Sequence, residues 1–486
     1  RSTHCISSAA SDVYKRQDMI LLRSTETVFS NEVEVLVVGA GACGMTAALA
    51  ASEQGTEVLV LERDSKPSGS TSLSSGFIPA SGTRWQKEKG IEDDPELFAK
   101  DIQQKAKGKA DEALVRLTTE FAGPCLEWLS DQHGIPFEVL EGFLYPGHSR
   151  LRMHTVPEHT GSSLLQRLHQ AVAKREIPVL CEATVSGLFV NNHQKVLGVR
   201  VLRSDGSTED LGCRTLVLAC NGYGGNAKLL KRFIPELEGM HYFGHNGNQG
   251  DAVLWGEALG AELRDMSAFQ GHGSVAHPHG ILITWALMME GGIQVNLEGK
   301  RFSNEHQGYS EQSVSVFQQP EHLAWDLYDA RLHQLGLEFE DYRNADQMGA
   351  IRSAHDLEKL SKIMSLPKTN LERTFQDIED FHLGKRKDSF GRDFKEKPML
   401  EPPYYAVQVS CSLFHTQGGL AVNSEARVMH KEGYPLPNLF AGGGAAQGVS
   451  GPAVWGYLSG NGLLTAITLG RLAGEHAGKQ ASQSKA

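Results

Sequence analysis

The sequence predicts an α/β fold in which a Rossmann-like dinucleotide-binding domain is interrupted by an inserted α+β cap domain. The first observation behind this prediction is a glycine-rich turn between two β-rich runs, residues 33–38 and 57–62. The second is a central stretch that mixes short strands with helices, the latter expected at 321–335 and 370–383. The length of 486 residues is also too great for one ordinary core, and it indicates two or three domains.

The domain boundaries follow from changes in composition along the chain. We expect the dinucleotide-binding domain at 19–238 and 398–477 and the cap, or substrate domain, at 239–397, since prolines mark the return near 398. Residues 1–18 lack an amphipathic period and look like adapter-derived sequence, so we expect the native chain to start at residue 19. The small and polar residues 478–486 are expected to form a flexible tail.

The first strand, turn and helix carry a complete dinucleotide fingerprint. Gly39 permits the tight turn, Gly41 lets the backbone approach a pyrophosphate, and Gly44 allows the helix to pack closely on the strand. The start of that helix presents free N–H groups to phosphates. The second strand ends on Glu62, eighteen residues after Gly44, where an acid can hold both ribose hydroxyls. Dinucleotide binding is the prediction.

Three further segments rich in small residues favour a flavin nucleotide. Residues 68–76 follow the second strand and can lie against a flavin ring, and residues 440–444 follow a short strand near the C-terminus. Residues 456–462 open the last long helix, whose N-terminal dipole can stabilise negative charge on the pyrimidine edge of a flavin. We find one GxGxxG motif, so no separate nicotinamide-binding domain is expected.

Composition excludes several classes of function. The formal net charge of −11 argues against a nucleic-acid partner, which requires a basic face. No apolar run reaches the roughly 18–20 residues of a transmembrane helix. The seven cysteines show no CxxC or zinc spacing, so we expect no metal, no iron–sulfur cluster and no c-type haem, and a cytoplasmic location.

Several motifs along the chain together resemble one family. They are VVGAGACG (37–44) with Glu62, GSTSLSSG (69–76), LACNG (218–222), Gly250-Asp251, GKRFSNE (299–305), HTQGGL (415–420) and LFAGGG (439–444). From residue 33 to about residue 476 the chain resembles the FAD-binding fumarate reductase and succinate dehydrogenase flavoprotein superfamily. That family can attach its flavin through a histidine in the loop after the second strand. Here the loop reads Ser-Gly-Ser-Thr, so the resemblance implies FAD held non-covalently.

The resemblance also implies a set of cofactor contacts. The residues expected to bind FAD are Gly39, Gly41, Ala42, Cys43, Gly44, Glu62, Arg63, Ser70, Thr71, Ser75, Gly76, Val185, Ala219, Asn221, Gly222, Asp251, His415, Gly443, Gly444, Ser459, Asn461 and Leu463. Gly444 departs from the family, because relatives often place a glutamate or asparagine there against the ribityl chain. The expectation for His415 is contact with the flavin through its backbone.

The substrate site departs from the family more strongly. Soluble fumarate reductases bind a dicarboxylate with two histidines and two arginines, and His272 matches the first histidine. Phe414 stands at the position of the second histidine. Tyr309, eight residues after Arg301, stands at the proton-donating arginine, and Tyr457 stands at the carboxylate-binding arginine. A buried dianion without cationic partners costs several kcal/mol per charge, so fumarate chemistry is disfavoured.

The two tyrosines resemble those of the 3-ketosteroid Δ1-dehydrogenase branch. In that branch one tyrosine takes a proton α to a ketone while hydride leaves the β carbon for flavin N5. A second tyrosine and a backbone N–H bind the ketone oxygen. The resemblance assigns these roles to Tyr309 and Tyr457, with His272 as a further catalytic residue and Tyr145 as a neighbour that assists the base. The rest of the expected substrate pocket is Phe414, Trp285, Gly460 and Gly462.

These features predict an FAD-dependent oxidoreductase that acts on a small apolar ketone or enone and uses a separate electron donor or acceptor. The direction, desaturation or reduction, stays open. Two alternatives also stay open. One is a carboxylate enzyme of the same superfamily that binds its substrate with other groups, for which Arg150 and Arg152 are candidates. The other is a flavin-bearing electron-transfer subunit with a vestigial pocket.

Overall fold

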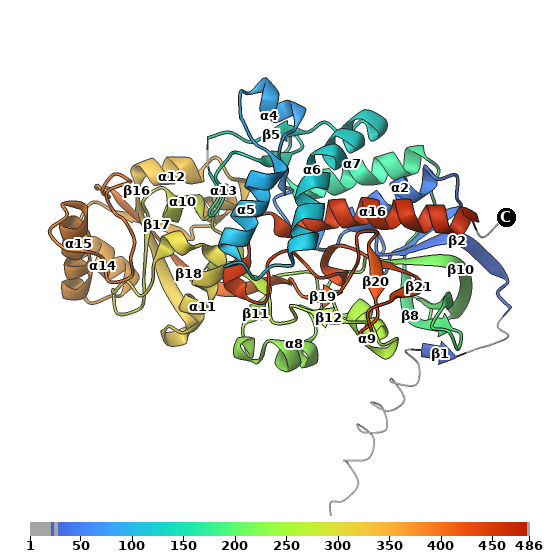
Figure 1. Cartoon of the computed structure of the whole chain (residues 1–486). Helices are drawn as coiled ribbons and strands as arrows, with labels where there is room; N and C mark the ends of the chain where they lie inside the picture. Colours follow the sequence, from blue (N-terminus) through green and yellow to red (C-terminus); the bar gives the residue numbers. More distant parts are fainter. Residues whose placement is uncertain (1–20, 24–27, 143, 484–486) are drawn as a thin grey trace, which may run out of the picture.

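The computed structural model describes residues 21–23, 28–142 and 144–483, and the segment 1–18 lies outside this range. The described chain forms two α/β parts, each built around its own sheet, that lie side by side (Figure 1). One is built on a nine-stranded sheet, the other on a seven-stranded sheet. The fold is therefore mixed α/β, as predicted.

The larger sheet forms the core of the dinucleotide-binding domain. Its main path is β1 (Leu21–Arg23), β8 (Ala183–Val190), β9 (Val196–Arg203), β10 (Thr208–Leu218), β2 (Asn31–Val38), β3 (Val58–Leu61) and β7 (Val179–Leu180), with β21 (Pro435–Ala441) and β20 (Arg427–Met429) branching from β10. Strands β10, β2 and β3 run parallel. Because parallel strands end at the same edge, the turns after them meet there.

Helix α2 (Ala42–Ser52) connects β2 to β3 and completes the expected βαβ unit. It is buried almost along its full length because α16 (Asn461–Gln483) packs across it. The close approach depends on small residues: a Cβ on Gly474 would lie 2.0 Å from the Ala47 carbonyl oxygen. The N-terminal end of α16 points to the middle of the molecule (Figure 1).

Further helices and short strands complete this domain. They are α3 (Gly69–Ser72), β4 (Ile78–Pro79), α4 (Arg84–Glu88), α5 (Pro95–Lys105), α6 (Glu112–His133), β5 (Glu138–Val139), β6 (Met153–Thr155), α7 (Gly161–Lys174), β12 (Leu263–Arg264), β19 (Gly419–Leu420) and the 3-10 turns η4 (Gly443–Ala445) and η5 (Val454–Gly456). β5 and β4 both pair with β6.

The second sheet forms the core of the cap. Its strands are β14 (Ile281–Leu282), β13 (Phe269–Ala276), β18 (Tyr404–Thr416), β16 (Leu323–Asp329) and β15 (Ile293–Val295), with β11 (His241–Tyr242) and β17 (Ile351–Ala354) also on β18. The helices of this part are α8 (Ala227–Phe233), α10 (Ala286–Met289), α11 (Tyr309–Phe317), α12 (Ala330–Gly336), α13 (Glu340–Gln347), α14 (Leu357–Met364) and α15 (Lys368–His382), with turns η1 (Pro235–Leu237), η2 (Glu305–Gln307) and η3 (Pro320–His322). Helix α9 (Asp251–Ala258) packs on β19, and its Ala252 and Trp255 belong to the core of the dinucleotide-binding domain.

The structure differs from the sequence prediction at three places. The helix expected at 321–335 is strand β16 followed by the short α12, because all seven residues of β16 are buried and a doubly covered strand lacks amphipathic alternation. The expected boundary at 397–398 precedes β18, the central strand of the cap sheet. Residues 478–483 continue α16 and are helical.

No helix within the described ranges is long and apolar enough to cross a membrane. The six cysteines in the described chain form no disulfide. The cytoplasmic location stays a prediction.

Candidate active site

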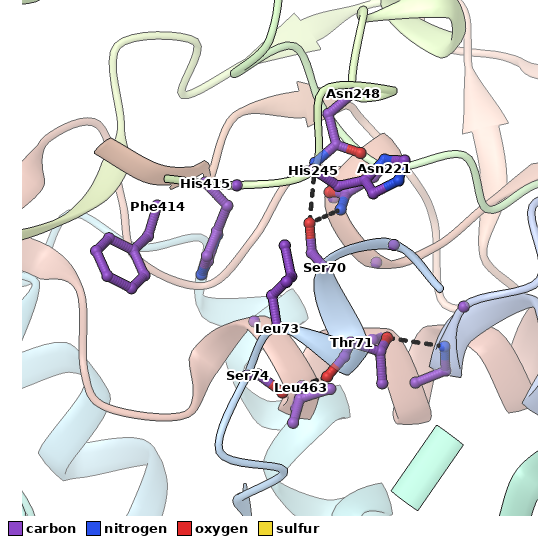
Figure 2. A pocket seen from close by; sticks show the side chains of 18 of the residues that line it. Ser70, Thr71, Leu73, Ser74, Asn221, His245, Asn248, Phe414, His415 and Leu463 are labelled. Carbon is purple, nitrogen blue, oxygen red and sulfur yellow. Dashed lines mark hydrogen bonds between the residues drawn. The ribbon is translucent and has the colours of Figure 1, made fainter. Parts of the chain in front are cut away.

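A continuous cavity runs from the glycine turn after β2 to a group of aromatic side chains under the cap. Most of the predicted site residues line it: Gly39, Gly41, Ala42, Cys43, Glu62, Arg63, Ser70, Thr71, Ser75, Gly76, Tyr145, Val185, Ala219, Asn221, Asp251, His272, Trp285, Tyr309, Phe414, His415, Gly443, Gly444, Tyr457, Ser459, Gly460, Gly462 and Leu463. Figure 2 shows part of this lining, with side chains from both domains directed at one space.

The glycine turn is shaped for close approach to a ligand. Gly39 has φ +104°, and a Cβ there would lie 2.5 Å from the Ala219 carbonyl oxygen. Nearby, Glu62 accepts a hydrogen bond from the Ala40 backbone N–H at 2.9 Å, which fixes its carboxylate beside the turn. The turn, the helix start and the acid therefore lie as a dinucleotide site requires.

Hydrogen bonds fix two hydroxyl side chains of α3 that line the cavity (Figure 2). Thr71 Oγ1 accepts from the Ala42 N–H at 3.0 Å, and this ties α3 to the start of α2. Ser70 Oγ accepts from Asn221 Nδ2 at 2.8 Å and from Asn248 Nδ2 at 2.9 Å. With both oxygen lone pairs engaged, the Ser70 hydroxyl hydrogen is left to donate to a ligand.

The glycine at 444 has a local explanation. A Cβ at that position would lie 2.1 Å from Asn221 Oδ1. Asn221 thus occupies the space that a side chain at position 444 would need. Gly444 therefore leaves room for the Asn221 side chain, which donates to Ser70.

Three residues expected to bind the cofactor do not line the cavity and instead pack behind its wall. A Cβ on Gly44 would lie 1.8 Å from the Gly39 carbonyl oxygen, and one on Gly222 would lie 2.2 Å from Thr416 Oγ1, so both glycines allow tight packing. Asn461 donates to Ser450 Oγ at 3.1 Å inside the protein. Their direct contact with the cofactor stays a prediction, because these residues lie behind the residues that line the cavity.

One loop of the cap closes over the far end of the nucleotide site. Arg63 pairs with Asp251 at 3.3 Å and also donates to the Gly247 carbonyl. His245 Nε2 lies 2.8 Å from Asp64 Oδ2. Sequence reasoning missed His245, Gly247 and Asn248, although the run His-Asn-Gly-Asn-Gln-Gly directly before Asp251 is a glycine- and asparagine-rich loop signal.

The residues fit an FAD molecule along this cavity. A glycine turn and a helix start suit the pyrophosphate, Glu62 suits the ribose, and Leu73 exposes 56% of its surface while lining the cavity. A flat apolar ring would cover that leucine. At the other end His415 is half-buried, and a Cβ on Gly462 would lie 3.0 Å from its ring. His415 Nδ1 lies 2.8 Å from Gln417 Nε2, which orients the ring.

The aromatic end of the cavity is organised around Tyr309, the first residue of α11. Its ring stacks on His272 with centroids 4.8 Å apart, and its hydroxyl donates to Ser459 Oγ at 3.0 Å. Tyr457 lies beside it, with ring centroids 6.2 Å apart. The structure therefore brings together the two tyrosines and the histidine that sequence analysis selected.

Both phenols are held in their neutral form. Burial, and next the neighbouring Tyr457, raise the pKa of Tyr309 well above its usual value. Burial also raises the pKa of Tyr457 to about 12, although the backbone groups of Gly460 and Gly462 at the start of α16 oppose the shift. At neutral pH both side chains are hydrogen-bond donors.

His272 is also neutral, since burial lowers its pKa to about 3. Its Nδ1 accepts from the Ser274 backbone N–H at 3.1 Å, so Nε2 carries the hydrogen. Trp285 lies edge-on to its ring with centroids 5.8 Å apart, and Phe414 is tilted to it with centroids 5.6 Å apart. His272 is thus a neutral donor within an aromatic box.

The remaining walls are mostly apolar. Phe243 stacks on Phe414 at 5.0 Å, and Tyr145 meets Phe77 edge-on at 6.0 Å. Burial raises the pKa of Tyr145 as well, so this phenol adds no charge. Lining residues that sequence analysis missed include Phe77, Met153, Phe243, Gln270, Leu282, Thr284, Phe339 and Asp341. Apart from Gln270, which stands two residues before His272, they come from segments without a motif and meet only in the folded chain.

The two arginines proposed for carboxylate binding are placed elsewhere. Arg152 is 1% exposed and pairs with Asp93 at 2.8 Å and with Asp101. Arg150 is exposed and donates to the Glu92 carbonyl at 3.0 Å. Of the described residues that line the cavity, Arg63 is the one arginine or lysine, and it lies at the nucleotide end.

The described residues contain no group of three or more histidine, cysteine, aspartate or glutamate side chains placed to hold a metal ion. A dinucleotide cradle that opens into a buried, phenol-bearing pocket defines a flavin-dependent oxidoreductase. The chain belongs to the FAD binding domain family, whose model matches residues 34–463. It is an FAD-dependent oxidoreductase of the fumarate reductase flavoprotein superfamily, and the predicted cofactor and superfamily are confirmed.

Similar proteins include both carboxylate and ketone enzymes. The chain is 29% identical over 455 residues to a probable fumarate reductase of Shewanella frigidimarina, covering 93% of this chain and 76% of that protein. A flavocytochrome c3 fumarate reductase structure gives a TM-score of 0.79 at 28% identity, covering 93% of this chain and 79% of the other. The 3-ketosteroid-Δ4-(5α)-dehydrogenase of Rhodococcus jostii RHA1 gives a TM-score of 0.74 at 25% identity, covering 93% and 98%.

Proposed function

We propose that this protein transfers hydride between the flavin and the carbon β to a ketone, in a small apolar ketone or enone of ketosteroid-like character. The observation that carries the proposal is the pair Tyr309 and Tyr457, two neutral phenols whose ring centroids lie 6.2 Å apart. Around them, at the aromatic end of the cavity, the described lining residues include no arginine or lysine. Such a site suits a neutral carbonyl and disfavours a dianion. The similarity to a ketosteroid dehydrogenase also supports it.

Tyr457 binds the ketone oxygen. Its hydroxyl lies at the N-terminal end of α16, beside the backbone of Gly460 and Gly462. When the α carbon of the ketone loses its proton, or when hydride adds to the β carbon of the enone, negative charge develops on the ketone oxygen. A phenol donor and a helix N-terminus stabilise that charge in a buried site, as an oxyanion hole does.

Tyr309 holds the proton that is exchanged with the α carbon. Ser459 accepts its hydrogen bond at 3.0 Å and sets the direction of the hydroxyl. The stacked His272 ring fixes the plane of the phenol. With the proton present at neutral pH, Tyr309 is ready to donate it during enone reduction, whereas ketone desaturation requires the phenolate.

Bound FAD supplies the atom that accepts or donates the hydride. The glycine turn, Glu62, Ser70 and the start of α16 would hold it, and we propose that it is bound non-covalently, since the loop 68–71 offers no histidine. The electron donor or acceptor is proposed to be a separate molecule, because the sequence shows a single dinucleotide fingerprint.

A carboxylate substrate is the second candidate. The similarity to fumarate reductases and the retained His272 favour it. It would require a neutral pocket to bind an anion, since Arg150 and Arg152 lie outside the cavity. The third reading, an electron-transfer subunit, predicts bound flavin without a response to any small substrate.

An anaerobic flavin spectrum separates these candidates. A saturated 3-ketosteroid and succinate are added separately to the oxidised protein, and the matching enone and fumarate to the dithionite-reduced protein. The proposal expects bleaching by the ketosteroid or reoxidation by the enone. A response to the dicarboxylates alone contradicts it, and silence toward all four with flavin bound supports the electron-transfer reading.

A further inference from the structure

A buried ionic cluster lies directly behind the loop 457–460. At its centre Arg152 donates Nη2 to Asp93 at 2.8 Å and Nη1 to Asp101, and all three side chains are almost fully buried. Ser149 adds two hydrogen bonds to Asp101 Oδ2, each 2.8 Å, from its backbone N–H and its hydroxyl. Because the guanidinium is bonded on two sides, its position is fixed.

His148 connects this cluster to the loop. Its Nε2 lies 2.9 Å from the Ser459 carbonyl oxygen, and its Nδ1 lies 3.4 Å from Arg152 Nη1. An arginine can only donate and a carbonyl can only accept, so both contacts require the same tautomer, with the hydrogen on Nε2. Burial, and next the Arg152 charge, lower the pKa of His148 to about 3, so the ring stays neutral.

The same turn also packs on the loop. A Cβ on Gly147 would lie 2.6 Å from Leu458 Cδ1, so the two segments are in close contact beside the hydrogen bond. The residue whose carbonyl His148 holds, Ser459, is also the residue whose hydroxyl accepts from Tyr309. Tyr457 lies two positions earlier in the same loop. The bond from His148 therefore acts on both groups that the proposed reaction uses.

We propose that His148 is a positioning residue: by donating Nε2–H to the Ser459 carbonyl, it holds the loop 457–460 so that Ser459 and Tyr457 meet the substrate together with Tyr309. The inference rests on the proposed function for its catalytic consequence. Its structural part, the restraint of the loop, stands on the contacts of His148 alone. Small displacements of reacting groups are costly, of the order of 10²-fold for 1 Å.

Two variants of His148 and one control test this role. His148→Leu removes the donor, while His148→Gln keeps an amide N–H at the place of Nε2. His154→Leu is the control, since His154 is equally buried and bonds the Arg152 carbonyl at 2.9 Å and Thr83 at 2.8 Å without lining the cavity. Each is measured for FAD content, ketosteroid Kd from the flavin difference spectrum, kcat, and amide hydrogen exchange of residues 457–460.

We expect His148→Leu to lower kcat by about 10- to 100-fold with Kd changed by less than about threefold, and to speed amide exchange in 457–460. His148→Gln should restore kcat to within about threefold of the parent protein, and His154→Leu should leave kcat and the exchange of this loop unchanged. Equal losses in His148→Gln and His148→Leu, or an unaltered loop in His148→Leu, would overturn the inference. If the parent protein ignores ketones while His148→Leu still loosens the loop, the proposed function fails and the restraint by His148 stands.

Discussion

The phenol of Tyr309 donates to Ser459 Oγ at 3.0 Å, and this bond joins the two domains at the active site. Tyr309 begins α11 on the cap, whereas Ser459 lies in the loop that leads into α16 of the FAD-binding domain. The proposed catalytic group is therefore complete only while the cap sits on the other domain. Movement of the cap would separate the proposed proton donor, Tyr309, from the proposed oxyanion site at Tyr457 in one step.

Replacement of Tyr309 tests its role as proton carrier. Tyr309→Phe keeps the ring that stacks on His272 and removes the hydroxyl, so FAD content should be unchanged while kcat falls by about 10²- to 10⁴-fold. The matched control is Tyr342→Phe, which removes a buried cap hydroxyl bonded to Tyr328 at 2.7 Å and lies outside the cavity. Intact turnover in Tyr309→Phe would rule out the proton role.

The oxyanion role of Tyr457 predicts a different pattern. Tyr457→Phe should lower kcat by about 10²- to 10³-fold, because the lost bond strengthens as charge develops on the ketone oxygen. Substrate Kd should change much less than kcat. Stopped-flow measurement of flavin reduction gives both quantities. A rise in Kd with an unchanged rate constant would show that Tyr457 only binds the substrate.

The pH dependence should differ between the two directions. Since burial raises the pKa of Tyr309 well above its usual value, the phenol is present throughout the neutral range and only a small fraction is phenolate. Ketone desaturation, which needs the phenolate, should therefore rise about tenfold per pH unit between pH 7 and 9. Enone reduction, which needs the phenol, should show no such rise. Anaerobic half-reactions at several pH values measure both, and a flat desaturation profile would contradict the assignment of the base.

Local signals were sufficient for the nucleotide half of the site. Gly39, Gly41 and Glu62 are close in sequence, and the βαβ geometry that their spacing indicates is dictated by backbone sterics and helix polarity. The tyrosines were identified through the resemblance to a family, and the structure brings them together as that resemblance implied. For all of these, one short segment or one motif carried the prediction.

Other features depend on distant segments and could not be predicted. Ser459 was expected to bind only the cofactor, but its partner Tyr309 lies 150 positions earlier in the chain. Residues 321–335 were expected to form a helix but form a strand and a short helix. Because β16 is buried on both faces, its sequence lacks the alternation of polar and apolar residues that marks a strand. From the sequence alone Arg152 is a candidate substrate ligand, whereas in the structure it is paired with Asp93 and Asp101.

Gly444 and Asn221 should be energetically coupled. Gly444→Ala places a methyl group 2.1 Å from Asn221 Oδ1, so Asn221 must move and Ser70 loses a donor. We expect weaker FAD binding, by at least about tenfold, and a lower Tm. Asn221→Gly relieves the clash, and its backbone suits glycine because Asn221 has φ +66°. The double variant should therefore bind FAD better than Gly444→Ala, as measured by FAD titration; simple addition of the two losses would contradict the coupling.

Asp341 at the cavity wall should select against anionic substrates. It lies in the first turn of α13, two residues after Phe339, and neither an ion pair nor a hydrogen bond of its carboxylate is found among the described residues. Asp341→Asn should raise kcat/KM for a ketone with a distal carboxylate by about fivefold and leave that for a neutral ketone unchanged. This gain in kcat/KM should shrink at high salt, since Asp341 is exposed to solvent. Asp346→Asn, on the same helix but outside the cavity, is the control, and an equal gain in it would show that only net charge matters.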